Sequence, residues 1–398
     1  MRRLDIIYGH YISHVQGVNS VTNMFVHGKC YFQENEIEFK SIRHPLGKFD
    51  CIQNDDLYEN HQSGAQNRKV LHKSRMISFL KRFISSTSLG EAFRFYVRSV
   101  LPAKRTIARI ADNEVFDLII FQDAISASYF FKRSIKYHKA IIILHTSGNV
   151  YASLEKLLPH INRSKFFSRW YKHFYEDAIA GNDNVVFLSP SIAQKIDIVP
   201  DKKKRYVFNG IENEPFAPID HKKINIVCIG SVTKRKGQFL IIRSLSAICE
   251  EVLGQVNFYI VGTGDDLDNC KKLAAELGVA ANVTFMGQQK GVNEIVRKMD
   301  VIILPSFEEG MPISIIEGMR QGLYTLVTPV GGCVDMITPE VGEFIERDPN
   351  SITKAVEHIV KDGIITDERK SIIRKHYDHN FTLKKMIDSY SMILLDDK

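Results

Sequence analysis

Short apolar runs alternate with longer helical stretches along the whole chain. The apolar runs cover 4–9, 116–123, 139–145, 184–189 and 205–210, and then 224–230, 256–262, 282–287, 300–306 and 324–332. Candidate helices lie between them at 126–138, 166–180, 237–252, 266–278 and 292–299. Runs that are apolar on both faces and separated by helices are typical of a buried parallel sheet. The pattern therefore predicts a doubly wound α/β protein.

The rhythm of strand and helix restarts in the second half of the chain. The stretch NGIENEPFAPIDHKK (209–223), rich in Pro, Asn and charge, suits a linker between two units. A chain of 398 residues is long enough for two cores. We expect one domain over 1–208 and a second over 209–379. In sheets of this class, ligands bind beyond the carboxyl ends of the strands.

The composition, with 44% hydrophobic and 25% charged residues, is that of an ordinary globular protein. The six cysteines form no C-x-x-C pair and no cluster with histidine, which argues against disulfides and a zinc site and fits a reducing compartment. The sequence begins without the apolar core of a signal peptide, and no apolar run is long enough to span a bilayer. We therefore expect a cytoplasmic protein, and we expect no nucleic-acid partner.

The net charge of +7 is unevenly placed along the chain. Residues 1–220 hold 31 Lys and Arg against 22 Asp and Glu, which leaves 22 against 24 for residues 221–398. The basic residues concentrate in 67–109, where they surround Met76, Ile77, Phe79, Leu80, Phe83 and Ile84, and Glu91 is the sole acid. Two interpretations of this basic amphipathic segment stay open. It is either a solvated helix face over a core stripe, or a contact with an anionic membrane or lipid-phosphate acceptor at the inner face of the plasma membrane.

The stretch FEEGMPISIIEG (307–318) places one glutamate on a loop and another inside a helix. The strand 300–306 leads into a loop with Glu309, Pro312 suits the first helical turn, and Gly322 ends the helix. Glu317 then lies roughly 7–8 Å along the helix from Pro312. Free N–H groups at the helix start favour an anion, and carboxylates suit vicinal diols. A diphosphate with a sugar on one side and a ribose on the other has this shape.

A second loop brings positive charge to the same edge of the predicted sheet. The strand 224–230 leads into Lys234, Arg235 and Lys236, which can balance the charge of a leaving diphosphate without a metal. Two other patterns fail as ligand sites. GTGDDL (262–267) lacks the third glycine of a dinucleotide fingerprint, and DLD (266–268) is better explained as a helix cap than as a metal ligand. We therefore expect neither a metal nor another cofactor.

Several spaced motifs in this order resemble glycosyltransferase family 4, a retaining group with the GT-B fold. They are NGIE (209–212) and the segments 229–245, 259–288, 300–332 and 377–394. The resemblance extends over nearly the whole chain. It implies two Rossmann-like doubly wound domains that face a central cleft, with the first domain binding the acceptor and the second the donor. It also implies that residues 380–398 form a final helix that crosses back onto the first domain.

The resemblance assigns roles in donor binding to the second half of the chain. Glu309 should hold hydroxyls of the donor sugar, Glu317 the ribose, and Lys236 the diphosphate. The remaining donor-binding positions are Ser231, Arg235, Met286, Gly310, Met311, Pro312 and Ile313. The family usually has arginine where Ser231 stands, so one cation is missing. Our hypothesis is that Arg235 replaces it.

Two segments of the first half match loops that face the reacting centre in the family. HVQGVNSVTNMF (14–25) resembles the glycine-rich first loop, with Gly17 as the remaining glycine. His145 and Thr146 match a histidine-containing loop on the acceptor side, although a solitary histidine after a strand is often structural. The implied catalytic residues are Glu309, His145 and Lys236. The leaving phosphate itself takes the acceptor's proton, so Glu309 is not assigned as a nucleophile.

The implied activity is a metal-independent, retaining hexosyl transfer in bacterial cell-surface polysaccharide biosynthesis. The donor would be a UDP-, GDP- or TDP-sugar, and the acceptor a saccharide or a polyprenyl-diphosphate-linked saccharide. Three alternatives stay open. One is a sugar-nucleotide epimerase with the GT-B fold, which would convert the donor alone. The second is a phosphorylase, which would need a pyridoxal-bearing lysine and a longer chain. The third is a non-catalytic sugar-binding protein, which the departure at Ser231 favours.

Overall fold

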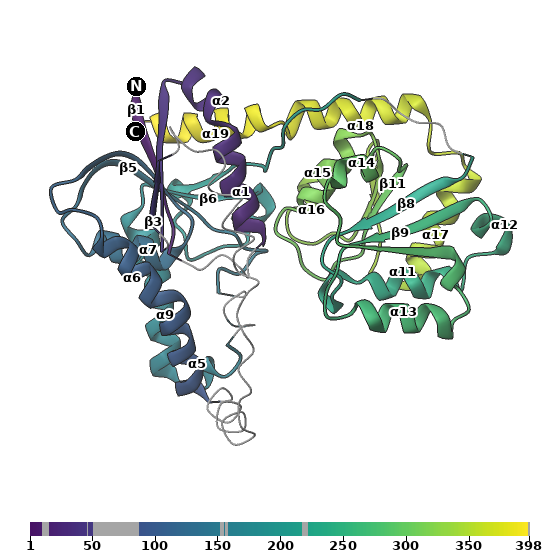
Figure 1. Ribbon diagram of the computed structural model, residues 1–398, viewed down its shortest axis with the longest axis horizontal. Helices are drawn as coiled ribbons and strands as arrows, with labels where there is room; N and C mark the ends of the chain where they lie inside the picture. The colour runs from purple at the N-terminus through teal and green to yellow at the C-terminus, as the bar shows by residue number, and fades with distance from the viewer. Residues whose placement is uncertain are drawn as a thin grey trace. The chain divides into compact units, whose positions relative to one another are not determined.

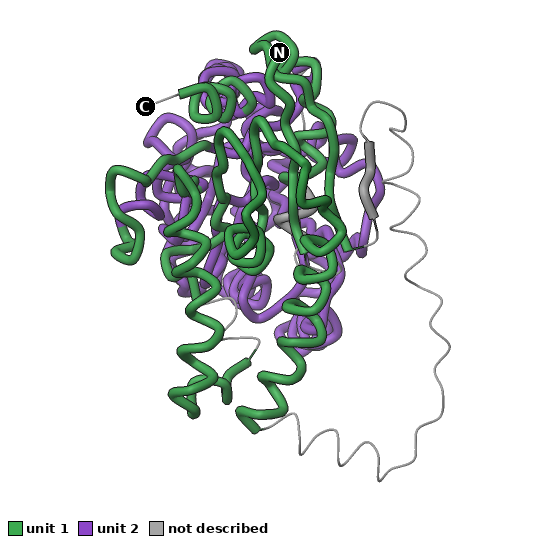
Figure 2. Tube along the Cα trace, turned by 90° about the vertical axis from the view of Figure 1, so that its left-hand side faces the viewer, with its two compact units in different colours: residues 1–187, 195–207, 387–398 green, residues 188–194, 208–386 purple. Residues whose placement is uncertain are grey.

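The computed structural model describes residues 1–9, 16–45, 47–50, 87–151, 155, 158–216 and 222–396. The chain divides into two compact units, coloured green and purple in Figure 2. Unit 1 is Met1–Phe187, Lys195–Val207 and Ile387–Lys398, and unit 2 is Leu188–Gln194 and Phe208–Met386. The break after Val207 lies beside the expected boundary. Leu188–Gln194 belongs to unit 2 because Ser191 there donates a 2.7 Å hydrogen bond to Asp335.

Unit 1 is built on a seven-stranded sheet in the order β3-β2-β1-β4-β5-β6-β7. The strands are β1 (Arg2–Ile7), β2 (Ile37–His44), β3 (Gly47–Asp50), β4 (Val115–Phe121), β5 (Lys136–Ile143), β6 (Asn184–Phe187) and β7 (Lys204–Tyr206). All pairs are parallel except β2 with β3, which is antiparallel. The five strands expected from the sequence are present. β2 and β3 were not expected, because β2 lacks a continuous apolar run.

Helices cover both faces of this sheet (Figure 1). The helices on one face are α1 (Gln16–His27) and α2 (Lys29–Glu34), and those on the other are α6 (Leu101–Ala108), α7 (Ala124–Phe131) and α9 (Lys165–Gly181). Right-handed crossovers require this arrangement, because β1 to β2 and β4 to β5 step in opposite directions across the sheet. The expected helix over 126–138 is shorter than predicted, since the strand β5 already begins at Lys136.

Unit 2 is built on a six-stranded parallel sheet in the order β10-β9-β8-β11-β12-β13. The strands are β8 (Ile224–Ile229), β9 (Val256–Val261), β10 (Val283–Gly287), β11 (Val301–Leu304), β12 (Tyr324–Val327) and β13 (Gly342–Phe344). All five strands expected here are present, and β13 is additional. The order of strands reverses between β8 and β11, which is the switch point where open α/β sheets bind ligands.

The helices of unit 2 also form two layers (Figure 1). The helices on one face are α11 (Gln238–Leu245), α13 (Leu267–Glu276) and α17 (Pro349–Lys361), and those on the other are α14 (Val292–Val296), α15 (Ile313–Arg320) and α18 (Asp367–Asn380). The single helix expected over 237–252 is in fact two, α11 and the short α12 (Glu250–Leu253). Buried Val, Ile and Leu side chains from both sheet faces form the core between these layers.

The last helix, α19 (Leu383–Leu395), belongs to unit 1 from Ile387 onward. Tyr390 packs edge to face on Phe25 of α1, with ring centroids 4.9 Å apart. Asn35 donates a 2.7 Å hydrogen bond to Asp388, and the Lys139 ammonium donates a 2.6 Å bond to the carbonyl oxygen of Asp396. The end of the chain therefore completes the face of unit 1 that α1 and α2 cover.

Candidate functional site

Two loops leave neighbouring strands at the carboxyl edge of the unit 2 sheet. The first follows β8 and contains the 3₁₀ turn η6 (Lys234–Lys236), and the second follows β11 and runs through Glu309 to the start of α15. The backbone N–H of Phe307 donates to the carbonyl oxygen of Arg235 at 2.8 Å. The Arg235 guanidinium donates in return to the carbonyl oxygen of Glu308 at 2.6 Å. These bonds fix the two loops against each other at the switch point.

The Glu309 carboxylate lies buried between these loops. Its Oε1 atom accepts a 2.7 Å bond from the Lys236 ammonium and a 2.6 Å bond from the Ser306 hydroxyl. Its Oε2 atom is 3.9 Å from the Arg235 guanidinium, outside hydrogen-bond distance. A carboxylate oxygen has two lone pairs, so Oε2 retains its capacity to accept hydrogen bonds from a ligand.

The loop that follows β12 supports the backbone at Glu309 from behind. Gly331 has φ +55, and a Cβ atom at this position would lie 1.8 Å from the carbonyl oxygen of Glu309. The N–H of Gly332 donates to the carbonyl oxygen of Gly310 at 2.6 Å. The Thr328 hydroxyl donates to the carbonyl oxygen of Ser306 at 2.6 Å. Glycine is therefore required at 331 for close backbone approach.

The basic triplet of the β8 loop presents its three side chains differently. Lys236 is largely covered, with 13% of its side chain exposed, whereas the Arg235 side chain is 45% exposed. Lys234 is exposed to solvent. Gly237, which precedes α11, has φ +73, and a Cβ atom there would lie 2.2 Å from the carbonyl oxygen of Pro305. This close approach holds Lys236 beside the β11 loop.

Glu317 lies in the middle of α15 and differs from Glu309 in its environment. The pKa of Glu317 is raised to about 7 because burial outweighs the Arg320 guanidinium, which lowers the pKa, and the nearby Glu214 carboxylate adds a smaller increase. Within the described part of the chain, the Glu317 carboxyl makes neither a hydrogen bond nor an ion pair. A half-buried carboxyl group in this state favours a ligand that donates hydrogen bonds to it.

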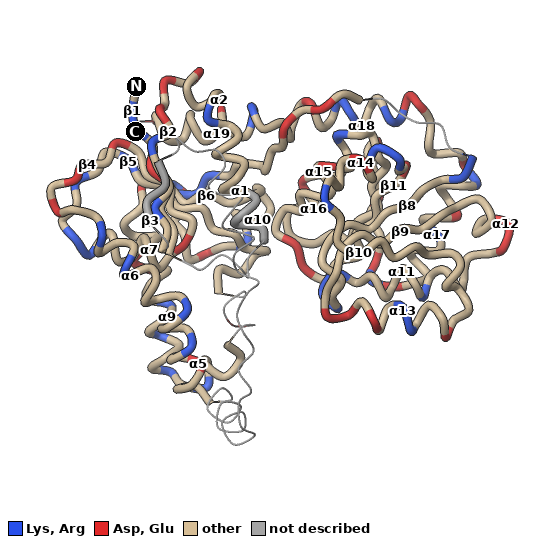
Figure 3. The backbone as a smooth tube through the Cα atoms, in the orientation of Figure 1, with Lys and Arg blue, Asp and Glu red and all other residues tan. Residues whose placement is uncertain are grey.

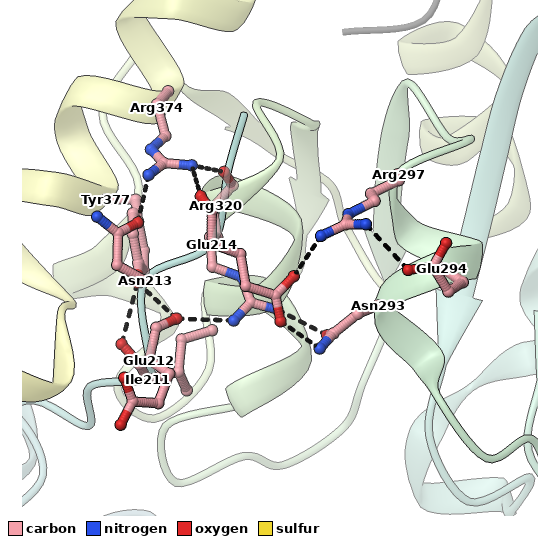
Figure 4. Close-up of polar contacts among 10 residues, drawn as sticks. All are labelled: Ile211, Glu212, Asn213, Glu214, Asn293, Glu294, Arg297, Arg320, Arg374 and Tyr377. Carbon is pink, nitrogen blue, oxygen red and sulfur yellow. Dashed lines mark hydrogen bonds and ion pairs between the residues drawn. The ribbon is translucent and has the colours of Figure 1, made fainter. Parts of the chain in front are cut away.

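The guanidinium of Arg320 is committed to other partners, which Figure 4 shows. It donates to the carbonyl oxygen of Glu212 at 2.7 Å and to Asn293 at 2.6 Å, and it lies 3.3 Å from the Glu214 carboxylate. Arg320 therefore lowers the pKa of Glu317 only through space. The same contacts attach residues 212–214, which follow the unit boundary, to α15.

Further arginine contacts make this attachment rigid (Figure 4). The Arg374 guanidinium on α18 donates to the carbonyl oxygens of Glu214 at 2.9 Å and Arg320 at 2.8 Å, and it also bonds the Asn213 side chain. Arg297 lies 3.1 Å from the Glu214 carboxylate. Glu317 therefore projects from a helix whose C-terminal end is held by several charge-assisted bonds.

The remaining donor-side positions expected from the sequence surround these groups less closely. Ser231 is half-buried, and its carbonyl oxygen accepts a 3.1 Å bond from the Gln238 side chain. Met286 is half-buried on β10, two strands away from β8. Pro312 is the N-cap of α15 and not its first helical residue, and Ile313 begins the helix. Met311 is buried, where its carbonyl oxygen accepts from the Asn209 side chain at 3.2 Å.

The three positions expected in the first half of the chain belong to unit 1. His145 follows β5, and its Nε2 atom lies 2.8 Å from the Gln122 side-chain oxygen, which follows β4. Burial lowers the pKa of His145 to about 4, so its ring is neutral at pH 7. The Thr146 hydroxyl donates to the carbonyl oxygen of Asn149 at 2.7 Å. Gly17 lies in the first turn of α1 and not in a loop, while residues 10–15 lie outside the described residues.

The structure thus brings the predicted residues Glu309, Lys236 and Arg235 together at one sheet edge. It also adds Ser306, Thr328, Gly331 and Gly332, which sequence reasoning did not select. Ser306 directly follows β11, and the glycine pair follows β12, so the rule that ligands bind beyond the strand ends was a usable signal for both. Asp266 is the N-cap of α13, as expected, although its carboxylate accepts from the Asn269 side chain at 2.8 Å instead of a backbone N–H. Among the described residues, no three His, Cys, Asp or Glu side chains are grouped so that they could hold a metal ion.

Comparison with known proteins supports a glycosyltransferase relationship. Residues 211–379, which are less than half of the chain, match the model of the family described as glycosyl transferases group 1. An uncharacterized glycosyltransferase of Methanocaldococcus jannaschii is 26% identical over 238 residues, covering 53% of this chain and 60% of that protein. The UDP-Gal:alpha-D-GlcNAc-diphosphoundecaprenol alpha-1,3-galactosyltransferase of Escherichia coli is 23% identical over 219 residues, covering 51% of this chain and 54% of that enzyme. The matches therefore span less than two thirds of these relatives.

Solved structures show the fold over the whole chain. The lipopolysaccharide outer core galactosyltransferase WaaB, in its apo form, is similar with a TM-score of 0.63 and 16% sequence identity, and the match covers 98% of each chain. Together with the two doubly wound sheets, this similarity confirms the expected GT-B fold. Unit 2 is the part that also resembles glycosyl transferases group 1 in sequence.

Proposed function

We propose that this chain is a retaining glycosyltransferase that transfers a hexose from a nucleotide-sugar and needs no metal ion. Unit 2, which resembles glycosyl transferases group 1, binds the donor. Unit 1 binds the acceptor. The observation that carries the proposal is the arrangement of Glu309, Lys236 and Ser306, where a buried carboxylate and an ammonium group meet at the switch point of a parallel sheet.

Each of these groups has a role in the proposed transfer. The free Oε2 atom of Glu309, with the backbone of Gly310 and Met311, accepts hydroxyls of the donor sugar. Lys236 and Arg235 stabilise the negative charge that develops on the departing diphosphate. These two side chains take the place of the metal ion that many diphosphate sites use. Because Lys236 is paired with Glu309 in the free protein, its ammonium group is already positioned when the donor binds.

The other carboxyl group holds the nucleoside. Glu317 has no partner of its own within the described residues, and an ionised carboxylate can accept both hydroxyls of a ribose diol. Pro312 and Ile313 place the N-terminus of α15 between Glu309 and Glu317, where free N–H groups favour the donor's phosphates. Ser231 and Met286 flank the nucleotide.

The chemical step exchanges one bond for another at the anomeric carbon. The bond from this carbon to the diphosphate oxygen breaks, the bond to the acceptor hydroxyl oxygen forms on the same face, and the acceptor's proton moves to the leaving phosphate. Glu309 takes no part as a nucleophile. In unit 1, we assign acceptor binding to Thr146 and to His145, which is neutral at pH 7, and we keep Gly17 as a candidate residue of the same unit.

The class of acceptor is proposed from the relatives. The Escherichia coli relative acts on a sugar linked to diphosphoundecaprenol, as its name states, and the structural neighbour WaaB is a lipopolysaccharide galactosyltransferase. We assign this chain to cell-surface polysaccharide biosynthesis, with a saccharide or polyprenyl-diphosphate-linked saccharide as acceptor. The proposed donor is a UDP-, GDP- or TDP-sugar.

A donor panel tests this proposal. The purified protein is incubated with UDP-, GDP- and TDP-sugars, with and without EDTA, in the presence of polyprenyl-diphosphate-linked saccharides. We expect transfer that EDTA does not abolish, and an anomeric configuration, measured by NMR, that matches the donor's. Formation of an epimer without acceptor would identify an epimerase, and donor binding without any product would identify a sugar-binding protein. A product with inverted anomeric configuration would refute the retaining mechanism but would still support the transfer activity.

A further inference from the structure

The end of unit 1 formed by α5 (Ser88–Phe95), η3 (Tyr96–Val100), η4 (Ile161–Arg163) and the start of α9 exposes a group of large apolar side chains. We call this group the apolar tip, and its members are Leu89, Phe93, Tyr96, Val97 and Phe166. Leu89, Phe93 and Phe166 are 68%, 64% and 74% exposed. Spacings of four residues between 89, 93 and 97 place three of them along one side of a helical segment. Exposed apolar groups of this size mark an interaction surface.

The tip stands on a rigid base, so its exposure is a feature of the fold. Phe95 of α5 packs edge to face on Trp170 of α9, with ring centroids 5.5 Å apart, and both contact Phe174. Phe166 is four residues from Trp170 and therefore lies on the face of α9 that meets α5. The Ser88 hydroxyl donates to the carbonyl oxygen of His160 at 2.5 Å, which joins α5 to η4.

The exposed charges beside the apolar tip are positive in the part of the chain that the structure describes. Arg98, Arg163, Lys165 and Arg169 are exposed and make no ion pair within the described part of the chain. Figure 3 shows the Lys and Arg residues along α9 and beside α5.

The described acids of this region are engaged in hydrogen bonds. Glu91 is buried, accepts from the backbone N–H of His160 at 2.7 Å, and lies 3.5 Å from the Arg94 guanidinium. Glu155 is bound by the Tyr171 hydroxyl and the Asn162 amide. Among the described residues of this region, no exposed acid therefore competes with the cations for an anionic partner.

We infer that the apolar tip inserts into the surface of an anionic lipid bilayer, with the four cations contacting lipid phosphates. Apolar side chains bordered by unpaired Lys and Arg suit a membrane interface, where apolar burial and attraction to anionic headgroups add. The inference goes beyond the proposed function and does not depend on it. It also differs in its residues from the sequence-based hypothesis that segment 67–109 contacts an anionic membrane. The segment 67–86 lies outside the described residues, and the described surface includes η4 and α9, which that hypothesis did not contain.

Vesicle flotation of the full chain tests the inference. We expect binding at low salt to phosphatidylcholine vesicles that contain about one third phosphatidylglycerol, and at least about tenfold weaker binding to pure phosphatidylcholine. The double variant Phe93→Ser with Phe166→Ser should bind at least about tenfold more weakly than the wild type. Phe344→Ser, at an exposed position of unit 2, is the matched control and should bind like the wild type.

A charge variant and a spectroscopic readout complete the test. The triple variant Arg163→Gln, Lys165→Gln, Arg169→Gln should lose the preference for anionic vesicles, whereas Lys272→Gln on the exposed face of α13 should keep it. Trp170 is the sole tryptophan of the chain and lies at the base of the tip, so brominated anionic lipids should quench its fluorescence.

Three outcomes would overturn the inference. The first is no vesicle binding by the wild type at low salt, and the second is undiminished binding by the variant at Phe93 and Phe166, which would assign the contact to another part of the chain. The third is a dimer in sedimentation that this variant abolishes while no vesicle binds, which would make a second copy the partner. Thermal unfolding and the circular dichroism spectrum of each variant, compared with the wild type, show whether the fold is intact.

Discussion

Glu317→Gln is the substitution whose effect follows most directly from the structure. The pKa of Glu317 is raised from 4.5 to about 7, mainly by burial. Between these two values the folded protein holds a proton that the unfolded chain has released. The protonated Glu317 carboxyl therefore makes its full contribution to the free energy of unfolding below about pH 4.5. This contribution is lost as the pH rises through about 7. At 1.36 kcal/mol for each pKa unit, the loss amounts to about 3 kcal/mol.

Glutamine resembles the protonated acid in shape and has no charge. We therefore expect equal free energies of unfolding for the wild type and Glu317→Gln near pH 4.5, and a variant that is up to about 3 kcal/mol more stable above pH 7. Urea unfolding of both proteins at intervals from about pH 4.5 to about pH 8 measures the difference. Subtracting the curves removes every other titrating group, and Glu276→Gln on the exposed surface of α13 is the control.

Ligand binding should shift the pKa of Glu317 in the opposite direction to burial. A ribose diol donates hydrogen bonds to the ionised carboxylate, so binding of a nucleotide-sugar should lower the pKa of Glu317 and release a proton near pH 7. Calorimetry in buffers of different ionisation enthalpy measures this release, and Glu317→Gln should bind more weakly and release no proton. A flat stability difference between the variant and the wild type across this pH range would refute the burial argument. Wild-type affinity in the variant would refute the ribose assignment.

Three further substitutions test the rest of the site. Glu309→Gln should reduce kcat for transfer by about 10²-fold or more without unfolding the protein, and steady-state kinetics with near wild-type turnover would exclude the proposed role of this carboxylate. Arg235→Ala should weaken binding of a nucleoside diphosphate about tenfold in calorimetry, and unchanged affinity would end the hypothesis that it replaces the cation missing at Ser231. Gly331→Ala places a Cβ atom 1.8 Å from the carbonyl oxygen of Glu309 and should lower the free energy of unfolding by at least about 2 kcal/mol. Gly363→Ala, at a similar φ of +59 but with no atom within 4 Å, should lose only about 1 kcal/mol, and equal losses would show that backbone strain alone accounts for the effect.

The two sheets were predictable because most of their strands produce a local apolar pattern in the sequence. A buried parallel strand is apolar on both faces, so a strand such as β11, whose residues Val301–Leu304 are all buried, was recognisable as a continuous run. The three strands that escaped prediction lie near or at sheet edges, where β13 has only three residues and β2 has no continuous apolar run. In β13 only Gly342 is buried, so this strand carries no apolar run that the sequence could show.

Part of the candidate site was predictable for a similar reason. Glu309, Lys236 and Arg235 lie in loops that follow strands, and parallel strands end at one edge, so the sequence placed all three at the same edge of the sheet. Only the structure shows that β8 and β11 are neighbours in the sheet. The sequence did not predict the contacts that support Glu309. The Ser306 hydroxyl and the Gly331 backbone contact this residue from the ends of β11 and β12, and a strand order is needed to know that these two ends are neighbours.

The sequence by itself determined the class of the fold and the residue types that follow the strands, because these depend on local periodicity and chain order. Only the tertiary structure decided which oxygen of Glu309 is occupied, why the carboxyl of Glu317 titrates near neutrality, and which apolar side chains of α5 and α9 stay at the surface. Burial and electrostatic fields arise from groups far apart in the chain. They exist only once those groups have been brought together.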